Sequence, residues 1–237
     1  MRFYNYLTLL AVVLGMTACG YTNHFLDEEE ELPDDSPYQA KKDVNASAYN
    51  TWTYINLLTG ETEVHPDAGE WIYSGDGSTR AAQEAEEVGI DWHIAIHRYE
   101  IKTNGASVLN TGKTDILEVG TLPEGEYAPD CVADYDVECA KGEGETQYLV
   151  ITDMSNMMGG TIGYAYKPTI NTVLCDGITK TATGSMPPTI YGTTEEVFAL
   201  KWDDGSWAAL QITATYSTTG SSGYMSFNYK MHSAEKK

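Results

Sequence analysis

Apolar and polar residues alternate along much of the chain from residue 49 onward, and this period of two predicts β-strands. The first such run covers residues 49–57 and leads through Thr59-Gly60-Glu61 into residues 62–64, which predicts a hairpin. A second run covers residues 91–101. The later predicted strands cover residues 147–152, 163–166, 197–202, 207–216 and 223–231.

Turn and helix signals fall between these runs. Residues 203–206 (Asp-Asp-Gly-Ser) join two apolar runs and predict the clearest hairpin in the chain. Residues 80–88 (RAAQEAEEV) are good helix formers followed by Gly89, so they predict one short helix. No linker divides residues 44–237, and we therefore expect a single, mostly antiparallel all-β domain with one short helix.

The N-terminal residues predict export. Arg2 precedes a short apolar run at residues 7–14, and small residues then lead to Cys19. This run is well short of the ~20 residues that a membrane-spanning helix needs. The order resembles a bacterial lipobox, so we expect residues 1–18 to be a lipoprotein signal peptide and Cys19 to carry the lipid that anchors the protein to the outer membrane. An ordinary secretory signal with an incidental cysteine is the alternative.

Residues 19–43 are polar and strongly acidic, and they include Asp27 followed by four glutamates. Repulsion between like charges predicts a disordered tether. A signal for display on the outer leaflet is an equal alternative to a plain linker.

Composition narrows the possible partners. The formal net charge is −21 at pH 7, which repels phosphate backbones and anionic lipid. We therefore expect no nucleic-acid partner, and contact with the membrane only through the lipid anchor. The 17 tyrosines fit a β-rich domain, because aromatic residues suit a pleated surface.

Three cysteines follow Cys19. Cys131 and Cys139 bracket a short acidic loop, and disulfides persist in exported proteins, so this pair is predicted to bridge. Cys175 would then be an odd, buried thiol, with pairing to Cys131 or Cys139 as the alternative.

The sequence offers little to catalysis. It contains no GxSxG, HExxH or P-loop motif, and we expect no enzymatic activity. His93 and His97 have the spacing of a zinc pair on a helix, but on a strand they would lie roughly 13 Å apart. We therefore expect both histidines to be structural.

Several segments resemble the HmuY-like family of haem-capturing surface lipoproteins. Residues 49–57 (YNTWTYINL) resemble its opening aromatic strand, and residues 91–105 (DWHIAIHRYEIKTNG) resemble its most recognisable stretch. In that stretch His93 stands where an acid is expected and Ile96 where an aromatic is expected. Residues 198–212 resemble the closing hairpin, and residues 223–229 resemble the last strand.

This resemblance implies a mostly β fold that binds haem (iron protoporphyrin IX) in a cleft between loops at one end of the sheet. It also implies capture of haem from host haemoproteins and transfer to a TonB-dependent outer-membrane receptor, without catalysis.

The regions that correspond to the family's ligand loops contain methionines and no histidine. Haem iron takes axial ligands from His, Met, Cys or Tyr. We expect Met186 and Met158 to be the pair, with Met157 and Met154 as alternates for the second ligand. The competing interpretation is that these methionines fill gaps in the core, as methionine often does.

A second function from a different class stays open. Exposed Trp and Tyr side chains on a β scaffold would suit a surface adhesion or glycan-binding lipoprotein.

Overall fold

The computed structural model describes residues 37–75, 77–133 and 149–234, which belong to the unit Pro37–Lys237. Every strand pairing described in this unit is antiparallel. Its one described α-helix is α3 (Thr172–Cys175), so the predicted all-β class with one short helix is confirmed. No helix in these ranges is long and apolar enough to cross a membrane.

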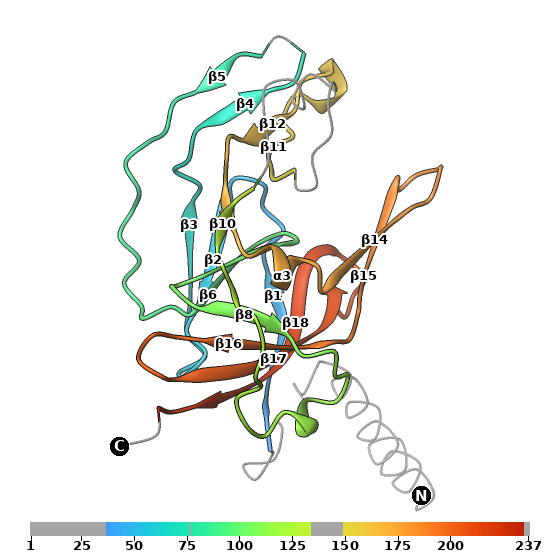
Figure 1. Ribbon diagram of the computed structural model, residues 1–237. Helices are drawn as coiled ribbons and strands as arrows, with labels where there is room; N and C mark the ends of the chain where they lie inside the picture. The colour runs from blue at the N-terminus through green and yellow to red at the C-terminus, as the bar shows by residue number, and fades with distance from the viewer. Residues whose placement is uncertain (1–36, 76, 134–148, 235–237) are drawn as a thin grey trace, which may run out of the picture. The chain divides into compact units, whose positions relative to one another are not determined.

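The largest sheet has six strands (Figure 1). Its order is β1 (Gln39–Asn45), β18 (Ser222–His232), β17 (Trp207–Tyr216), β16 (Val197–Lys201), β8 (Ser107–Asn110) and β9 (Ala128–Pro129). The hairpin predicted around residues 203–206 is confirmed, because β16 pairs with β17 from Val197 opposite Gln211 to Lys201 opposite Trp207.

A second sheet has four strands. Its order is β3 (Thr62–Pro66), β2 (Thr51–Ile55), β6 (Ile94–His97) and β7 (Glu100–Thr103). The predicted first hairpin is confirmed, since Thr51 lies opposite Pro66 and Ile55 opposite Thr62.

A third sheet and two strand pairs carry the segments of greatest functional interest. The sheet runs in the order β11 (Ile151–Asp153), β12 (Gly163–Ala165), β4 (Trp71–Tyr73) and β5 (Thr79–Arg80). The pairs are β10 (Cys131–Val132) with β13 (Thr169–Ile170), and β14 (Ile178–Ala182) with β15 (Thr189–Thr193). Two short 3₁₀ turns, η1 (Ile116–Glu118) and η2 (Met157–Gly159), complete the described elements.

The main core joins the inward-facing side chains of the first two sheets. Phe198 and Leu200 of β16 belong to it, together with Ile94 and Ile96 of β6. The alternate residue Val197 belongs instead to a smaller cluster with Ile116 of η1 and Trp207. Strand β16 is therefore covered on both faces, which explains why its sequence is apolar almost throughout.

The helix predicted at residues 80–88 is wrong. After β5 the chain runs in irregular, largely exposed conformation to residue 89, and Figure 1 shows it as a long stretch leading to β6. A short segment rich in Ala and Glu has no apolar face to bury, and isolated short helices are marginal in water. Glu86 instead contacts His65 at 3.1 Å, and the Gly89 N–H donates to Glu63 at 2.8 Å.

The predicted end of the tether at residue 43 also differs from the structure. Strand β1 begins at Gln39 and pairs with β18, and Val44 on it is buried. The sheet offers β1 a free edge, so backbone pairing there outweighs the polar character of residues 39–43. The signal peptide, Cys19 and the tether up to residue 36 lie outside the described residues.

Cys175 is a buried thiol, as predicted, and its Sγ lies 3.2 Å from the Ile101 backbone nitrogen. It is not bonded to Cys131, so that alternative pairing is wrong in this structure. Cys139 lies outside the described residues, and its pairing with Cys131 stays a prediction.

His65 provides a pH-dependent contact between β3 and the irregular segment. Its ring nitrogens lie 2.9 Å from Glu63 and 3.1 Å from Glu86. The hydrogen bond to Glu63 is the main cause that raises the pKa of His65, and the bond to His65 lowers the pKa of Glu63. The imidazolium is therefore more favoured in the folded protein than in the unfolded chain.

We predict that His65→Gln lowers the free energy of unfolding more at about pH 5.5 than at about pH 8.5. A raised pKa gives stability that is present below the unfolded value and is lost as the pH rises through the folded value. Urea unfolding of both proteins at the two pH values measures this difference. Thr62→Val, at an exposed position of the same strand, changes no titratable group and is the control, so its effect should be the same at both pH values. Equal losses for His65→Gln at the two pH values would contradict the linkage.

Candidate functional site

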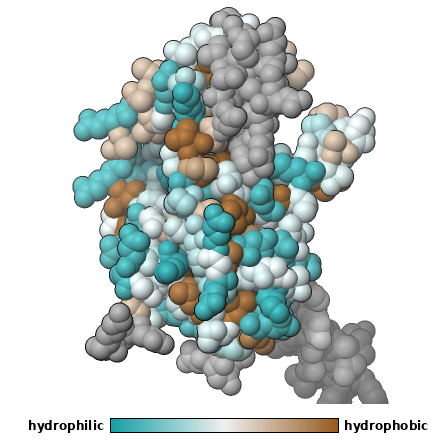
Figure 2. Space-filling model, in the orientation of Figure 1, coloured by the Kyte–Doolittle hydropathy of each residue, from teal (hydrophilic) through white to brown (hydrophobic). Residues whose placement is uncertain are grey.

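The four methionines singled out from the sequence lie on two separate elements. Met154, Met157 and Met158 lie between β11 and β12, where η2 begins at Met157. Met186 lies at the tip of the arm formed by β14 and β15 (Figure 1). In the space-filling view this arm protrudes from the surface, and its hydropathy is mostly neutral (Figure 2).

Two of these side chains are almost fully exposed. Met158 is 94% exposed and Met186 is 86% exposed, whereas Met157 is 45% exposed. Met154 is partly buried and lines a cavity. Met158 and Met186 therefore do not fill gaps in the core, which is the usual structural role of methionine.

Two glycines build the turn that presents Met157 and Met158. Gly160 has a φ of +83°, in the left-handed region that side chains disfavour. A Cβ on Gly159 would collide with the side chain of Asn156. The Gly-Gly pair therefore serves the tight turn itself, and the turn directs the methionines outward.

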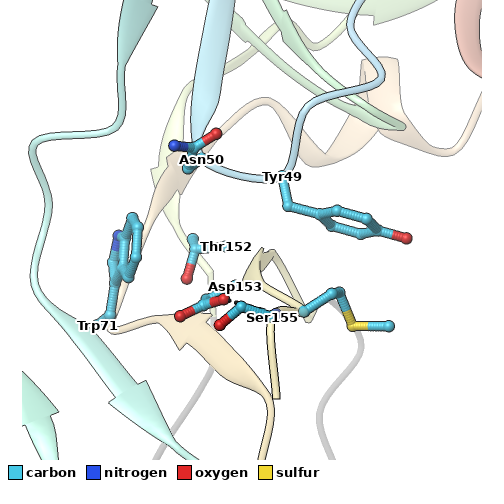
Figure 3. Close-up of a pocket in the computed structure, with 7 residues that line it drawn as sticks. Tyr49, Asn50, Trp71, Thr152, Asp153 and Ser155 are labelled. Atoms are coloured by element: carbon cyan, nitrogen blue, oxygen red, sulfur yellow. Dashed lines mark hydrogen bonds between the residues drawn. The ribbon is translucent and has the colours of Figure 1, made fainter. Parts of the chain in front are cut away.

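A cavity of about 320 Å³ lies beside this turn. It is lined by Tyr49, Asn50, Trp71, Thr152, Asp153, Met154 and Ser155. These residues come from the approach to β2, from β4, and from β11 with the residues that follow it. Figure 3 shows the Tyr49 ring, the Trp71 ring and the Thr152 side chain arranged around one space.

The Asp153 carboxylate brings negative charge to the cavity wall. It accepts hydrogen bonds from the Ser155 N–H at 2.8 Å and from the Tyr73 hydroxyl at 3.3 Å. The bond from the Ser155 backbone is the main cause that lowers the pKa of Asp153. Asp153 is therefore ionised at neutral pH, and the cavity disfavours an anionic group.

A buried carboxylate holds the Trp71 wall in place. One oxygen of Asp67 accepts from Trp71 Nε1 at 2.8 Å, and the other accepts from Trp52 Nε1 at 2.7 Å. The Arg80 guanidinium lies 3.3 Å from the Trp71 ring centroid. The indole is thus fixed at its nitrogen and by a cation on its ring.

A row of rings leads from the cavity toward the β14–β15 arm. The Arg98 guanidinium lies 4.0 Å from the Tyr49 ring and 5.5 Å from the Tyr99 ring. The Tyr99 ring stacks on Tyr191 of β15 with centroids 3.6 Å apart. We call Tyr49, Arg98, Tyr99 and Tyr191 the ring platform. It connects the base of the arm that carries Met186 with the wall of the cavity that contains Met154.

Arg98 reaches this position through an unusual backbone conformation. Its φ is +50°, which a non-glycine residue seldom adopts. The side chain donates to the Ser47 carbonyl at 2.6 Å, and this bond fixes the guanidinium over Tyr49. Such conformations persist only where surrounding contacts hold them.

Two tyrosines of the third sheet and its flank have structural positions. Tyr164 and Tyr166 pack against Ile72 in a small cluster under β4. Neither of them belongs to the ring platform.

The two central histidines also have structural contacts. His97 is fully buried, its Nε2 donates to the Tyr49 carbonyl at 2.6 Å, and its Nδ1 lies 3.3 Å from Glu100. His93 Nδ1 accepts from the Leu57 N–H at 3.2 Å. In the part of the chain that the structure describes, no group of three or more His, Cys, Asp or Glu side chains could hold a metal ion.

Most cavity residues carry no local signal of their role. Tyr49 and Asn50 lie about a hundred positions from Thr152 and Asp153, and only the tertiary structure brings them together. Met154 is the one cavity residue among the ligand candidates. The sequence feature that could have indicated the cavity is the Thr-Asp-Met run at the end of a predicted strand, because functional side chains often follow strand ends.

Comparison with known proteins finds one family and several similar solved structures. The family model described as HmuY protein matches residues 48–229. The HmuY analog (TFO) of Tannerella forsythia, solved in its apo form, has a TM-score of 0.68 at 33% identity, covering 82% of this chain and 95% of that chain. None of the curated proteins matches.

Two further solved structures are similar. Apo PinO from Porphyromonas gingivitis has a TM-score of 0.66 at 25% identity, covering 81% of this chain and 97% of that chain. A Bacteroides vulgatus protein described as HmuY-like and heme-binding has a TM-score of 0.60 at 27% identity, covering 81% and 90% of the two chains.

We predict that Asp67→Asn lowers the free energy of unfolding by about 1–3 kcal/mol. An amide offers one acceptor oxygen, so one of the two buried indole N–H groups loses its partner. Urea unfolding measures the loss, and near-ultraviolet circular dichroism reports the tryptophans. Asp203→Asn, in an exposed turn, is the matched control and should change stability by no more than about 0.5 kcal/mol. Equal effects of the two substitutions would contradict a special role for Asp67.

Proposed function

Because this chain belongs to the HmuY family, we propose that it binds haem through its exposed methionines and delivers it to a receptor in the outer membrane. The role is one of binding and transfer, without catalysis. Met186 and Met158 are the proposed axial ligands, and Met157 and Met154 are the alternates for the second position.

The exposure of Met158 and Met186 carries this proposal. Methionine is among the residues most often buried, so two that stand almost fully in water on turns are accessible to a partner. Thioether sulfur is among the donors that haem iron accepts. The donor set on the two elements therefore fits the group that the family binds.

The positions of Met157 and Met154 decide which of them is the better alternate for the second axial ligand. Met157 follows Asn156 at the start of η2 and is about half exposed, so it could replace Met158 with a small change of the turn. Met154 lies inside the cavity wall beside Tyr49. It would have to leave that wall to reach an iron outside the cavity, and this makes it the weaker alternate.

The ring platform supports a flat ligand between the two elements. Stacking of Tyr99 on Tyr191 ties the base of the arm to the main domain, and Arg98 holds Tyr49. Preorganised aromatic surfaces reduce the entropy that binding costs. We propose that the platform keeps the arm at a defined place while the methionines at its tip and on η2 engage the haem.

Soft, neutral thioethers favour the reduced metal, so a site with two methionine ligands would bind ferrous haem more tightly than ferric haem. Redox-dependent affinity follows from this ligand type. Equal affinity for ferrous and ferric haem would argue against a pair of methionines.

The surface location remains part of the proposal. We propose cleavage after residue 18, lipidation of Cys19 and attachment to the outer membrane. The tether would then end near Gln39, where β1 begins. Host haemoproteins are the proposed source of haem, and a TonB-dependent receptor is the proposed acceptor.

We predict that the protein lacking residues 1–19 binds haemin saturably and that dithionite sharpens its Soret band. The Met158→Ala/Met186→Ala double variant should lose the low-spin ferrous spectrum and bind at least about tenfold more weakly, since each lost ligand removes an iron–sulfur bond. Visible absorbance titrations before and after reduction measure both effects.

Leu58→Ala/Ile190→Ala is the matched control, because it removes two other exposed apolar side chains, one of them on the same arm. Its spectrum should equal that of the parent protein. A low-spin ferrous spectrum that survives the methionine double variant would move the ligands to Met154, Met157 or a histidine. Absence of any saturable change in either redox state would refute haem binding.

A further inference from the structure

The cavity beside η2 contains a polar group without a protein partner. Thr152 is 1% exposed, and its hydroxyl oxygen makes no hydrogen bond within the described residues. Figure 3 shows this side chain between Asn50 and Trp71, with its hydroxyl oxygen directed toward the side of the cavity where Asp153 lies. Buried hydroxyl groups are almost always hydrogen-bonded, so a buried, unpaired hydroxyl that lines a cavity indicates a place for a ligand atom.

Other polar groups face the same cavity. The Asn50 carboxamide can both donate and accept, and the Asp153 carboxylate can only accept. Because Asp153 is ionised, the cavity disfavours carboxylates and phosphates, including the propionate groups of a porphyrin. A ligand satisfies all three residues if it donates a hydrogen bond to Asp153 and both donates to and accepts from Asn50 and Thr152. Hydroxyl groups do this, since each can donate and accept.

Two fixed aromatic rings form the apolar part of the wall. Arg98 lies 4.0 Å from the Tyr49 ring, and Arg80 lies 3.3 Å from the Trp71 ring. The Trp71 nitrogen is already bonded to Asp67, so this side chain offers the cavity apolar surface and no donor. Rings with carbon-bound hydrogens on their faces pack well against such surfaces.

The size of the cavity limits the ligand. Its volume of about 320 Å³ is at the lower end of the roughly 300–1,000 Å³ that ligand pockets span. A porphyrin is too large to enter it, whereas a single sugar ring is not.

We propose that this cavity binds a neutral, hydroxyl-rich ligand the size of a monosaccharide. Thr152, Asn50 and Asp153 pair with its hydroxyl groups, and Tyr49 and Trp71 pack on its carbon-bound hydrogens. The proposal does not depend on haem binding, because none of these five residues is a proposed iron ligand.

The test uses the protein lacking residues 1–19, which retains the whole unit Pro37–Lys237. Glucose, galactose, mannose and N-acetylglucosamine are the probes, and isothermal titration and tryptophan fluorescence are the readouts. We expect at least one probe to bind saturably at millimolar concentration. Thr152→Val keeps the shape of the side chain and removes its hydroxyl, and it should weaken that binding about tenfold.

The variant should fold at least as well as the parent, because it removes a buried hydroxyl that has no partner in the free protein. Thermal unfolding checks this. Thr62→Val, on an exposed position of β3, is the matched control and should leave binding unchanged. Asn50→Ala changes an exposed side chain and gives an independent loss of affinity.

Three results would overturn the proposal. The first is that no sugar binds saturably, and the second is that Thr152→Val and Asn50→Ala leave sugar binding unchanged. The third is that the small amine ethanolamine, added as a further probe, binds and the sugars do not. A haemin titration of Thr152→Val separates the two sites, since loss of sugar binding with intact haemin binding assigns the effect to the cavity. Failure of haemin to bind the parent protein leaves the sugar result unaffected.

Discussion

The Asp67 carboxylate is the interaction on which the arrangement of the strands around the cavity depends. It accepts the indole N–H of Trp52 from β2 and that of Trp71 from β4, and so it joins two different four-stranded sheets. A carboxylate that is 8% exposed is costly to bury without partners. Its two indole donors, the Gly69 N–H and the nearby Arg80 offset that cost and define the angle at which Trp71 enters the cavity wall.

The same cations and rings connect the core with the candidate sites. Arg80 lies over the Trp71 ring, and Arg98 lies over the Tyr49 ring, so each aromatic ring of the cavity wall contacts a guanidinium. From Tyr49 the ring platform continues to Tyr191 on β15. The arm that carries Met186 is thus held at its base by stacked rings, while Met186 itself is exposed. This division suits a binding protein, because a fixed frame lowers the entropy that binding costs while the ligating side chains stay accessible.

The surface contains two kinds of site with opposite chemical demands. Met158 and Met186 present soft, apolar donors to solvent, whereas the cavity presents Thr152, Asn50 and an ionised Asp153. The negative charge of Asp153 distinguishes the two sites, because it disfavours anionic groups in the cavity. An anionic ligand of the methionines would therefore bind outside the cavity. Met154 and Tyr49 lie where the two regions meet.

The amino-acid sequence by itself determined most of the strands that carry a strong alternating pattern. The run at residues 91–101 is the exception, because a turn at Arg98 and Tyr99 divides it into the hairpin of β6 and β7. Residues 197–216 form the predicted hairpin and residues 51–66 form another, because alternation and a Gly-containing turn are local properties that packing of the sheets reinforces. The family resemblance could likewise be identified from the sequence, because residues 49–57 and 91–105 supply many of the buried side chains of the core. The methionines could also be singled out, because the family resemblance indicated the ligand loops and thioether sulfur is a ligand that haem iron accepts.

Only the tertiary structure decided the rest. Residues 80–88 have helical propensity but no apolar face, so contacts with Glu63 and His65 determine their path. Strand β1 forms at acidic and basic residues because β18 offers an edge to pair with. The arm of β14 and β15 was not among the predicted strands, since its exposed residues lack alternation. The cavity joins Tyr49, Trp71 and Thr152 from three distant segments, and no local pattern can encode a contact between segments that only the tertiary fold brings together.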